Sequence, residues 1–596
     1  YREERPDVDQ VYMNALQLMT GSGGWPLNIV ALPDGRPVWG ATYLNKDQWT
    51  DVLLQLQNLH KNQPETLAEY ASKLLQGIKT MDLISKSNEQ VHFKSFDYKK
   101  LLNNWSRHFD QVNGGSKGAP KFMMPNNLHF LLRYAFQTKD HQLSEYVKLS
   151  LTKMAYGGIF DHINGGFSRY SVDERWHIPH FEKMLYDNAQ LVSLYSDAFL
   201  VYKNPLFKEV VFQTLHFIER ELSKKEGGFY SALDADSINA FGVLEEGAYY
   251  VFTKEELKEE LKEDYELFSD YYNINSFGKW ENNFYVLIRT QCDDEFCQKQ
   301  QLSKADFRTK KKHWIQSLLQ HRTTKNRPRL DNKIICSWNA MMIKAYTDAY
   351  KVFNEIEFLN IALKNATFLI QTLLQDQQKL KRTYTSGKVN TEAFLEDHAH
   401  LIAAFIALYE CTFDMHWLIR AKKLTTNCIE NFFDNESGMF FYSSSTGEQL
   451  ISRPIEVRDN VIPSSNSVMA KNLYWLGTFY DDTKLINTSQ QMLTSVQAEI
   501  NNYPQGYSNW LDFQLNFSHP FYEVVICGKG ADQKSTALNA HYIPNKLLAG
   551  TSQPSDLPLF NNRFEKEKTN YYLCTQGACN LPETKLSEVI SSIKFN

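Results

Sequence analysis

The stretch Phe160–Gln190 concentrates side chains that do acid–base chemistry within an otherwise apolar, aromatic-rich chain. It contains three histidines together with acidic and basic residues. Imidazole titrates near neutral pH, so His180 is a candidate general acid or base. A carboxylate can orient a histidine, and an arginine can hold a hydroxyl or carboxylate group of a substrate. We predict catalytic roles for His180, Asp161 and Asp187, and substrate contacts for His162, Arg169, Trp176, Lys183 and Tyr186.

A helix is expected to begin at Pro179, because proline suits the first turn, where its missing N–H is not needed. From that start Lys183 and Asp187 would follow His180 by three and seven residues, so the three side chains would share one helical face. Tyr186 would lie on a neighbouring face. If the first face points toward a central funnel, the funnel floor gains a histidine, a lysine and an aspartate. The competing interpretation is a buried polar network that ties the loop to the helix, since buried polar groups need partners.

Two further carboxylates lie close together in the segment SALDADS. Asp234 and Asp236 could act as general acid and nucleophile on a glycosidic bond, which makes Asp234 a catalytic candidate and Asp236 a substrate contact. Capping of the loop is the structural alternative. A calcium loop is disfavoured, because Ile238 and Asn239 stand where an EF-hand needs an oxygen ligand and a glycine.

Other polar residues stand at expected helix starts. Glu396 and Asp397 precede one apolar helix, and Trp338 and Asn339 open another; we predict that all four contact the substrate. Acidic residues there also favour the helix dipole, and tryptophan is equally suited to a core. His398 adds a titratable group at the first of these helix starts.

Metal and thiol sites are not predicted. His177 and His180 have metal-ligand spacing, but no third ligand can be named, so we expect neither a metal nor another cofactor. Cys574 and Cys579 could be a redox pair or structural thiols, and their spacing differs from that of thioredoxin motifs. Eight cysteines in 596 residues are no disulfide framework. A reducing compartment, the cytoplasm, is the expectation.

Composition excludes several classes of partner. The formal net charge is −5, with acids and bases interspersed, which argues against nucleic acid binding. The longest apolar runs fall short of the 18 residues of a membrane span. A small-molecule substrate remains the expected partner, and the many aromatic residues are a hint toward a sugar. The oligomeric state is not predictable.

Helix after helix is predicted between residues 95 and 515, from apolar residues at three- and four-residue spacing. The segment Phe109–Gly115 is repeated as Phe160–Gly166, 51 residues further on. A unit of that length is one α-hairpin, and about six units fit into this region. We therefore predict an (α/α)6 toroid of inner and outer helices, with Asp110 and Asp161 in equivalent turns. An open helical solenoid is the rival architecture.

The two ends of the chain have mixed α/β character. Residues 1–90 read as helix, strand, turn, strand and helix, with Gly21 ending the first helix and Pro33-Asp34-Gly35 forming the turn. Residues 516–596 contain the strand-like segments FYEVVICG, HYIPNKLLAG and NYYLCTQGAC and a closing helix. The predicted fold is mainly α, with a truncated N-terminal α/β segment and a small C-terminal α/β module.

Several long motifs together resemble one family. REERPDVDQVYMNALQLMTGSGGWPL, GAPKF, GGIFDHINGGFSRYSVDERWHIPHFEKMLYDNAQL, SALDADS and PSSNSV are similar to the thioredoxin-domain-containing family that includes spermatogenesis-associated protein 20 and its bacterial relatives. The resemblance covers nearly the whole chain. It implies a thioredoxin-like domain joined to a six-hairpin toroid similar to N-acylglucosamine 2-epimerases and six-hairpin glycosidases. It also implies a cis peptide bond before Pro26.

Family members carry a cysteine motif before REERPD, whereas the first cysteine here is Cys292. We therefore expect the thioredoxin-like part to lack thiol redox activity on its own. The function expected from these observations is sugar epimerisation or isomerisation by proton transfer in the funnel. A glycoside hydrolase with paired carboxylates and a non-enzymatic, thioredoxin-linked scaffold are the alternatives. Two histidines facing each other across the funnel would favour epimerisation, whereas two carboxylates would favour hydrolysis.

Overall fold

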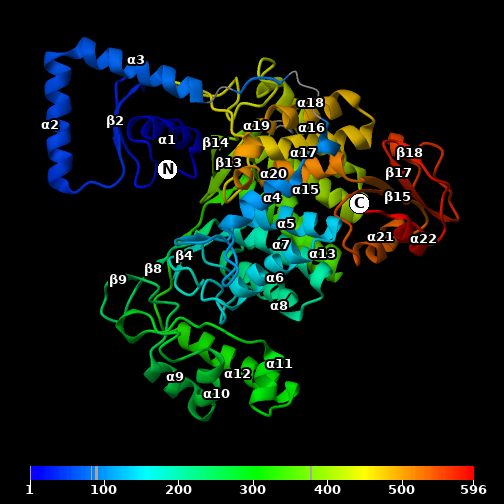
Figure 1. Cartoon of the computed structure of the whole chain (residues 1–596), viewed down its shortest axis with the longest axis horizontal. Helices are drawn as coiled ribbons and strands as arrows, with labels where there is room; N and C mark the ends of the chain where they lie inside the picture. Colours follow the sequence, from blue (N-terminus) through cyan, green and yellow to red (C-terminus); the bar gives the residue numbers. More distant parts are fainter. Residues whose placement is uncertain (1, 82–83, 88–91, 376–378, 596) are drawn as a thin grey trace.

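Long inner helices run side by side around a central axis in the computed structural model, which describes residues 2–81, 84–87, 92–375 and 379–595 (Figure 1). In ring order they are α5 (Pro125–Thr138), α7 (Leu185–Tyr202), α13 (Cys336–Phe353), α15 (Leu395–Thr412), α17 (Ser465–Tyr480) and α20 (Ser508–Ser518). Each packs against the next, and α20 packs against α5, so the ring closes. The chain returns to the same end before each inner helix, which makes them parallel.

Outer helices connect the inner ones. They are α6 (His141–Tyr156), α8 (Pro205–Phe217), α14 (Ile356–Thr372), α16 (Met415–Asn431) and α18 (Thr483–Ser495), each packed on the inner helix that precedes it. The chain enters the toroid through η1 (Phe93–Ser95) and α4 (Tyr98–Trp105), and η1 packs on α20 and completes the ring. The predicted (α/α)6 toroid is confirmed. Its core lies between the two layers, where Trp338 and Trp510 are almost fully buried.

The repeated Phe-Asp-x-x-x-Gly-Gly segments form the same turn twice. In one copy Asp110 accepts hydrogen bonds from the backbone N–H groups of residues 112 and 113, and in the other Asp161 does so from those of residues 163 and 164. Both glycine pairs have positive φ, which glycine adopts without strain. Each turn precedes an inner helix at the same end of the toroid, so the predicted equivalence of Asp110 and Asp161 is confirmed.

A further signature of the repeat was not predicted. Asn188, Asn339 and Asn466, near the starts of α7, α13 and α17, each bridge the backbone N–H and C=O of the phenylalanine that ends the preceding turn. His398 is the fourth residue of α15 and bonds the carbonyl of Phe394 through Nδ1, as Asn339 bonds Ile335. Through these hydrogen bonds the asparagine side chains hold each turn against the inner helix that follows it.

The N-terminal region is a small α/β unit beside the toroid (Figure 1). It comprises α1 (Pro6–Thr20), the antiparallel hairpin β1 (Asn28–Ala31) and β2 (Pro37–Ala41), α2 (Lys46–Asn62) and α3 (Pro64–Met81). Gly21 caps α1 in the left-handed conformation, as predicted, and the Trp25–Pro26 bond is cis. No described residue of α2 is buried, and Val38, Leu67 and Ala71 form the small core.

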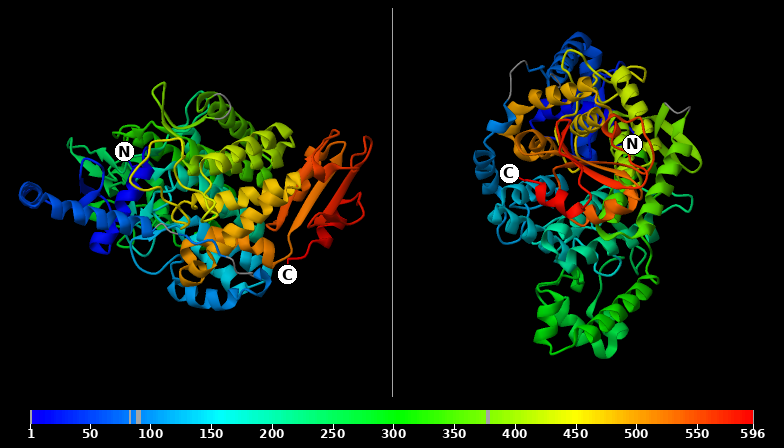
Figure 2. Two further views of the ribbon diagram at one scale, coloured as in Figure 1. Left: turned by 90° about the horizontal axis from the view of Figure 1, so that it is seen from above. Right: turned by 90° about the vertical axis from the view of Figure 1, so that its right-hand side faces the viewer.

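The C-terminal region is a mixed sheet in the order β16-β15-β17-β18, flanked by α21 (Ala531–Asn539) and α22 (Leu586–Ser592). Its strands are β15 (Tyr522–Gly528), β16 (Lys546–Thr551), β17 (Thr569–Thr575) and β18 (Ala578–Cys579), so the three predicted strands are confirmed. Cys574 and Cys579 form a disulfide in the last hairpin. The sheet covers one end of the helical ring (Figure 2).

An insertion between α8 and α13 projects from the toroid (Figure 1) and was not predicted. It contains α9 (Lys254–Leu261), α10 (Tyr265–Tyr271), α11 (Asp293–Lys299) and α12 (Lys304–Arg322), and it has its own aromatic core around Phe268, Tyr271 and Trp314. Within the described ranges, no helix is long and apolar enough to cross a membrane.

Candidate functional site

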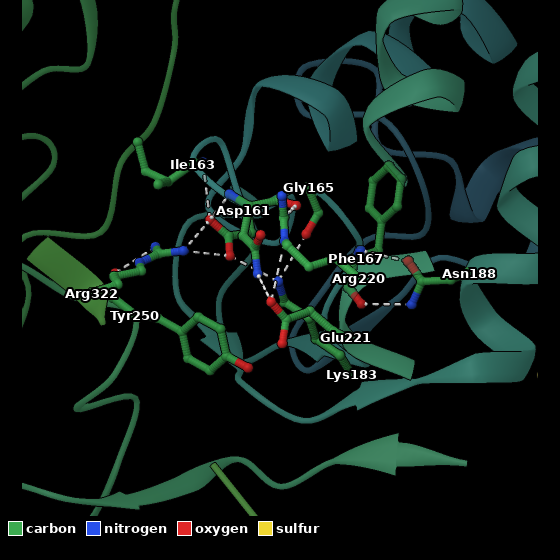
Figure 3. A network of polar contacts seen from close by, with 11 residues as sticks. Asp161, Ile163, Gly165, Phe167, Lys183, Asn188, Arg220, Glu221, Tyr250 and Arg322 are labelled. Carbon is green, nitrogen blue, oxygen red and sulfur yellow. Dashed lines mark hydrogen bonds and ion pairs between the residues drawn. The ribbon is translucent and has the colours of Figure 1, made fainter. Parts of the chain in front are cut away.

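Many of the sequence-predicted residues lie in two separate places, and the first is an ionic network around Asp161 (Figure 3). Asp161 accepts hydrogen bonds from Lys183 at 2.8 Å and from Arg322 Nη1 at 2.9 and 2.8 Å. Lys183 also donates to the carbonyl of Gly165 at 2.9 Å, and Arg322 to that of Tyr250 at 3.0 Å. The two cations hold the pKa of Asp161 far below its ordinary value despite burial. Asp161 and Lys183 thus join the glycine turn to the end of α12.

The predicted helix from Pro179 is wrong. Pro179–His180 and Lys183–Met184 are the short strands β5 and β6, and α7 begins only at Leu185. β5 pairs with β4 (Tyr170–Ser171), and β6 pairs with β7 (Ala232–Leu233). His180, Lys183 and Asp187 therefore do not share a helical face. Pairing with β4 and β7 outweighs the local helix preference, because it satisfies backbone groups that a first helical turn would leave open.

Four other predicted contacts serve the fold. His162 Nε2 lies 3.1 Å from the carbonyls of Tyr156 and Gly157, and burial lowers its pKa to about 3. Trp176 donates from Nε1 to the carbonyl of Asn113 at 2.9 Å. Asn339 locks the Phe229 turn, and Trp338 is buried against Tyr186 at 4.8 Å between ring centroids. Each of these side chains is buried with partners within the protein.

The second place is the rim of the toroid, at the N-terminal ends of the inner helices. His180 Nδ1 lies 2.7 Å from Glu246 and its Nε2 3.7 Å from Glu182, which in turn accepts a hydrogen bond from Arg169 at 3.0 Å. Hydrogen bonds to Glu182 and Glu246 raise the pKa of His180 to about 9. The imidazole is therefore a cation at neutral pH. Neither Glu182 nor Glu246 was predicted as a site residue.

Asp234 and Asp236 lie close together beside this rim, and the backbone N–H of Asp236 donates to Asp234 Oδ1 at 3.4 Å. Asp234 forms an ion pair with Arg329 at 3.0 Å. Asp236 stands in β8 (Asp236–Ile238), where burial and the neighbouring carboxylates of Asp234 and Glu246 raise its pKa. Both residues belong to the outer wall of the rim.

Across the ring, a second ionic cluster holds Glu396 and Asp397. Arg382 Nη1 lies 3.0 Å from Asp397 and 3.3 Å from Glu396, and Tyr442 donates to Glu396 at 2.8 Å. Arg382 Nε also donates to the backbone carbonyl of Glu3 at 2.7 Å. The segment 2–5 of the N-terminal region therefore lies against the rim, held further by ion pairs to Lys333 and Glu448.

Asp187 differs from its neighbours. Its carboxyl is buried, and no group in the described part of the chain bonds its Oδ2 atom. Burial raises its pKa well above the ordinary value, with Arg169 opposing the rise. Burial therefore favours the protonated form of this carboxyl, which lies next to Tyr186.

Below the rim, the ring encloses a chamber with a volume of about 360 Å³. All the inner helices line it, and Tyr542, Pro544 and Lys546 of the C-terminal region form its floor. None of the site residues predicted from the sequence lines it, and the polar side chains that were missed include His129, Arg133, Asp197, Lys344, Lys351, His400, Glu410, Lys471 and Asp512. The available signal was a single polar residue on the inward face of an otherwise apolar helix, such as Asp197 in LVSLYSDAFLVY.

Two of these residues are neutral histidines. His129 comes from α5 and His400 from α15, which stand three places apart in the ring and therefore face each other. Burial lowers the pKa of each to about 4, and Lys344 lowers that of His129 further. His400 Nε2 is buried, with no hydrogen-bond partner among the described residues, and His129 Nδ1 lies 3.7 Å from Asp197.

A ladder of carboxyls and amines descends from the histidines to the floor. Lys344 lies 2.5 Å from Asp348, and Lys351 lies 2.9 Å from Glu410. Among the described residues, no lysine or arginine forms an ion pair with Asp197; burial and then Asp348 raise its pKa to about 7, although 36% of its side chain is accessible. That accessible surface faces the chamber and not bulk water. Asp348, held by the two lysines, has a lowered pKa. No cluster of metal-ligating side chains occurs in the parts of the chain that the structure describes.

Solved structures with a similar arrangement are carbohydrate enzymes. The cellobiose 2-epimerase from Bacillus thermoamylovorans is 11% identical and matches 67% of this chain and 86% of its own, with a TM-score of 0.44. A family 76 α-mannanase from Bacteroides thetaiotaomicron is 11% identical and matches 78% of this chain and 91% of its own, with a TM-score of 0.37.

Sequence relatives extend over almost the whole chain. Residues 1–79 match a family described as Thioredox_DsbH, protein of unknown function, DUF255. Spermatogenesis-associated protein 20 of Homo sapiens is 31% identical over 640 residues, covering 99% of this chain and 81% of the relative. The protein of the same name from Mus musculus is 30% identical with the same coverage. The chain therefore belongs to the family of spermatogenesis-associated protein 20.

Proposed function

We propose that the protein is a sugar epimerase or isomerase that moves a proton to and from a substrate held in the axial chamber. The observation that carries this proposal is the pair of neutral histidines, His129 and His400, on opposite walls of one cavity. Enclosed pockets of 300–1,000 Å³ are typical of small-molecule sites. Opposed imidazoles are what inversion at a carbon next to a carbonyl requires, since one face loses a proton and the other gains one.

The two histidines have different surroundings and therefore different roles. His400 Nε2 has no hydrogen-bond partner among the described residues, so this nitrogen is available to accept a proton from the substrate. His400 is therefore the proposed base. His129 stands beside Asp197, whose pKa of about 7 keeps much of it protonated at neutral pH. The His129–Asp197 pair is the proposed acid. In the reaction the C–H bond breaks, its proton goes to His400, and the enolate receives a proton from the opposite pair.

The rim residues take a supporting part in this proposal. Arg169, His180 and Asp236 would contact the substrate as it enters, whereas Tyr186, Asp187 and Glu396 are buried. Charged groups at a rim increase the rate at which a polar ligand finds its site. The small-molecule partner and these contacts are part of the proposal.

Glycoside hydrolysis is the second candidate, on a different observation. The lining of the chamber holds two carboxyl groups whose pKa values are shifted apart, up at Asp197 and down at Asp512. Such a pair suits a general acid and an ionised partner. The two reactions differ in their products, because hydrolysis releases a new reducing end and epimerisation does not.

Solvent hydrogen exchange tests the proposal. The full-length protein is incubated in D₂O with aldoses and 1,4-linked disaccharides, and deuterium at the carbon next to the carbonyl is followed by NMR. His400→Ala should lower exchange by about 10²–10⁴-fold, the usual contribution of a general base. His216→Ala, an exposed histidine of α8, is the control and should leave exchange unchanged. Exchange that survives His400→Ala, or release of reducing ends without exchange, would rule the proposal out.

A further inference from the structure

The chamber has more cationic groups than carboxylates. Its lining, as far as the described residues go, carries five cationic side chains and three carboxyls: Arg133, Lys344, Lys351, Lys471 and Lys546 against Asp197, Glu410 and Asp512. Asp348, which pairs with Lys344 behind the lining, adds a fourth carboxyl. The chamber therefore has an excess of positive charge. This excess is larger while Asp197 is protonated, because a protonated carboxyl carries no charge.

Most of these cations are committed to partners. Lys471 lies 2.7 Å from Asp512 and 2.5 Å from Asn509, and Arg133 bonds Asp512 and Asn516. Lys351 is paired with Glu410. These pairs hold neighbouring helices together; Glu410 balances the charge of Lys351, whereas Lys471 and Arg133 share the single carboxylate of Asp512.

Two lysines are different. Lys546 has no carboxylate within ion-pair distance in the described residues, and its one hydrogen bond goes to the backbone carbonyl of Ile543 at 3.2 Å. Lys344 is paired with Asp348, yet 51% of its side chain remains accessible, and that surface faces the chamber. A partly buried ammonium group without a counter-ion, such as that of Lys546, is less favourable than a paired one and gains from an anionic ligand.

We infer that the chamber binds a sugar that carries an acidic group, with its anionic oxygens on Lys546 at the floor and within reach of Lys344. This inference rests on the proposed function and adds the class of substrate. The shared chemistry is a carboxylate or phosphate on a polyhydroxylated ligand.

The shape of the chamber agrees with this orientation. From His400 to Glu410, α15 descends about 15 Å, so the histidines and the floor lie at opposite ends of the space. Ala403 and Ala407 line the wall between them and leave room for a ligand. A ligand anchored on Lys546 would place its other end near the histidines. Burial and the positive charge of Lys351 lower the pKa of Lys546 to about 8, with Glu410 opposing this, and a bound anion would raise this pKa again.

Binding measurements on the full-length protein test the inference. Thermal shift and calorimetry compare glucuronate, glucose 6-phosphate and glucose, at low and at high NaCl. At least one of the two acidic sugars should bind at least about tenfold more tightly than glucose, because one charge-assisted hydrogen bond contributes about that much. High salt should weaken the binding of the acidic sugars and leave the binding of glucose unchanged. The glucuronate and phosphate arms distinguish a carboxylate from a phosphate ligand.

Lysine variants assign the binding to the floor. Lys546→Met should remove the preference for the acid, Lys546→Arg should retain most of it, and Lys534→Met, an exposed lysine of the same region, should have no effect. If Lys546→Met does not fold, Lys344→Met provides the same comparison on α13. Equal binding of glucose and both acids, failure of both acids to bind at millimolar concentration, or an acid preference that survives both substitutions would overturn the inference.

The two proposals can fail separately. Acid-selective binding without deuterium exchange would refute the proposed reaction and support the ligand class. Exchange on neutral sugars without acid selectivity would support the reaction and refute the ligand class.

Discussion

Two polar networks of this protein use the same residue types for opposite purposes. In the network around Asp161, one carboxylate meets two cations and two backbone N–H groups within hydrogen-bond distance, and the side chains are buried. In the axial chamber, Asp197 has only a neutral histidine at 3.7 Å, and His400 Nε2 has no partner in the described residues. The first network is complete without a ligand, whereas the second is not.

The difference is visible in the direction of the pKa shifts. Two adjacent cations lower the pKa of Asp161, while burial without a close cation raises that of Asp197. A lowered carboxyl pKa means that the ionised form stabilises the fold, and a raised one means that it destabilises it. Groups that weaken the folded state and face a cavity are therefore better candidates for function than fully paired ones.

Removing the charge of Asp161 gives the largest expected effect on stability. Asp161→Asn leaves Lys183 and Arg322 buried without their counter-ion, which should lower the free energy of unfolding by about 3–5 kcal/mol. Because the folded-state pKa of Asp161 is lowered, the decrease in the free energy of unfolding should be largest above the ordinary carboxyl pKa. It should shrink as the pH falls below that value. Urea unfolding of the full chain measures this.

Asp110→Asn is the matched control, because Asp110 occupies the equivalent turn with only Lys121 as cation. It should cost less than Asp161→Asn. Equal losses in the two variants would mean that the turn, and not the ionic network, provides the stability.

His180 should give an intermediate effect with the opposite pH dependence. Its folded-state pKa of about 9 exceeds the ordinary value, so its pairing with Glu182 and Glu246 stabilises the fold below about pH 6.5, and this contribution is lost as the pH rises through 9. After allowance for solvent screening at this partly exposed site, His180→Ala should lower the free energy of unfolding by about 1–2 kcal/mol at pH 6. A stability difference that persists unchanged at pH 10 would contradict the ion-pair interpretation.

Asp197 should give the smallest effect on stability, with a reversed sign. Its folded-state pKa is raised, so ionisation above pH 7 destabilises the fold, and Asp197→Asn should increase the stability at pH 8 by about 1 kcal/mol after discounting for its accessible surface. Below pH 4 the variant and the parent should unfold alike. The same variant should lose deuterium exchange activity. If Asp197→Asn is destabilising like Asp161→Asn, the contrast between the two networks does not hold.

The sequence was sufficient for the architecture. Apolar spacing of three and four residues identified the helices of the ring, the repeated Phe-Asp-x-x-x-Gly-Gly turn marked the hairpins, and three apolar segments after residue 516 proved to be strands. These signals are local, because a helical face or a tight turn is defined within a few residues. The insertion that carries α9–α12 escaped notice, since its helices have the same periodicity as those of the toroid.

The candidate site depended on tertiary structure. His180 and Arg169 were found at the rim, but the helix expected from Pro179 is absent, because β5 pairs with β4 and β6 pairs with β7, which comes after α8 in the chain. Asp161 looked like an acid–base group until Arg322, 161 residues away along the chain, proved to neutralise it.

The chamber shows the same limit most clearly. His129, Asp197, His400 and Lys546 come from α5, α7, α15 and the C-terminal region, and only closure of the ring brings them to one cavity. Each is an ordinary polar residue in its own segment. What the sequence alone determined is which segments form helices, strands and turns; the ring decided which side chains meet, which are neutralised and which remain available to a ligand, because electrostatic environment depends on neighbours in space and not along the chain.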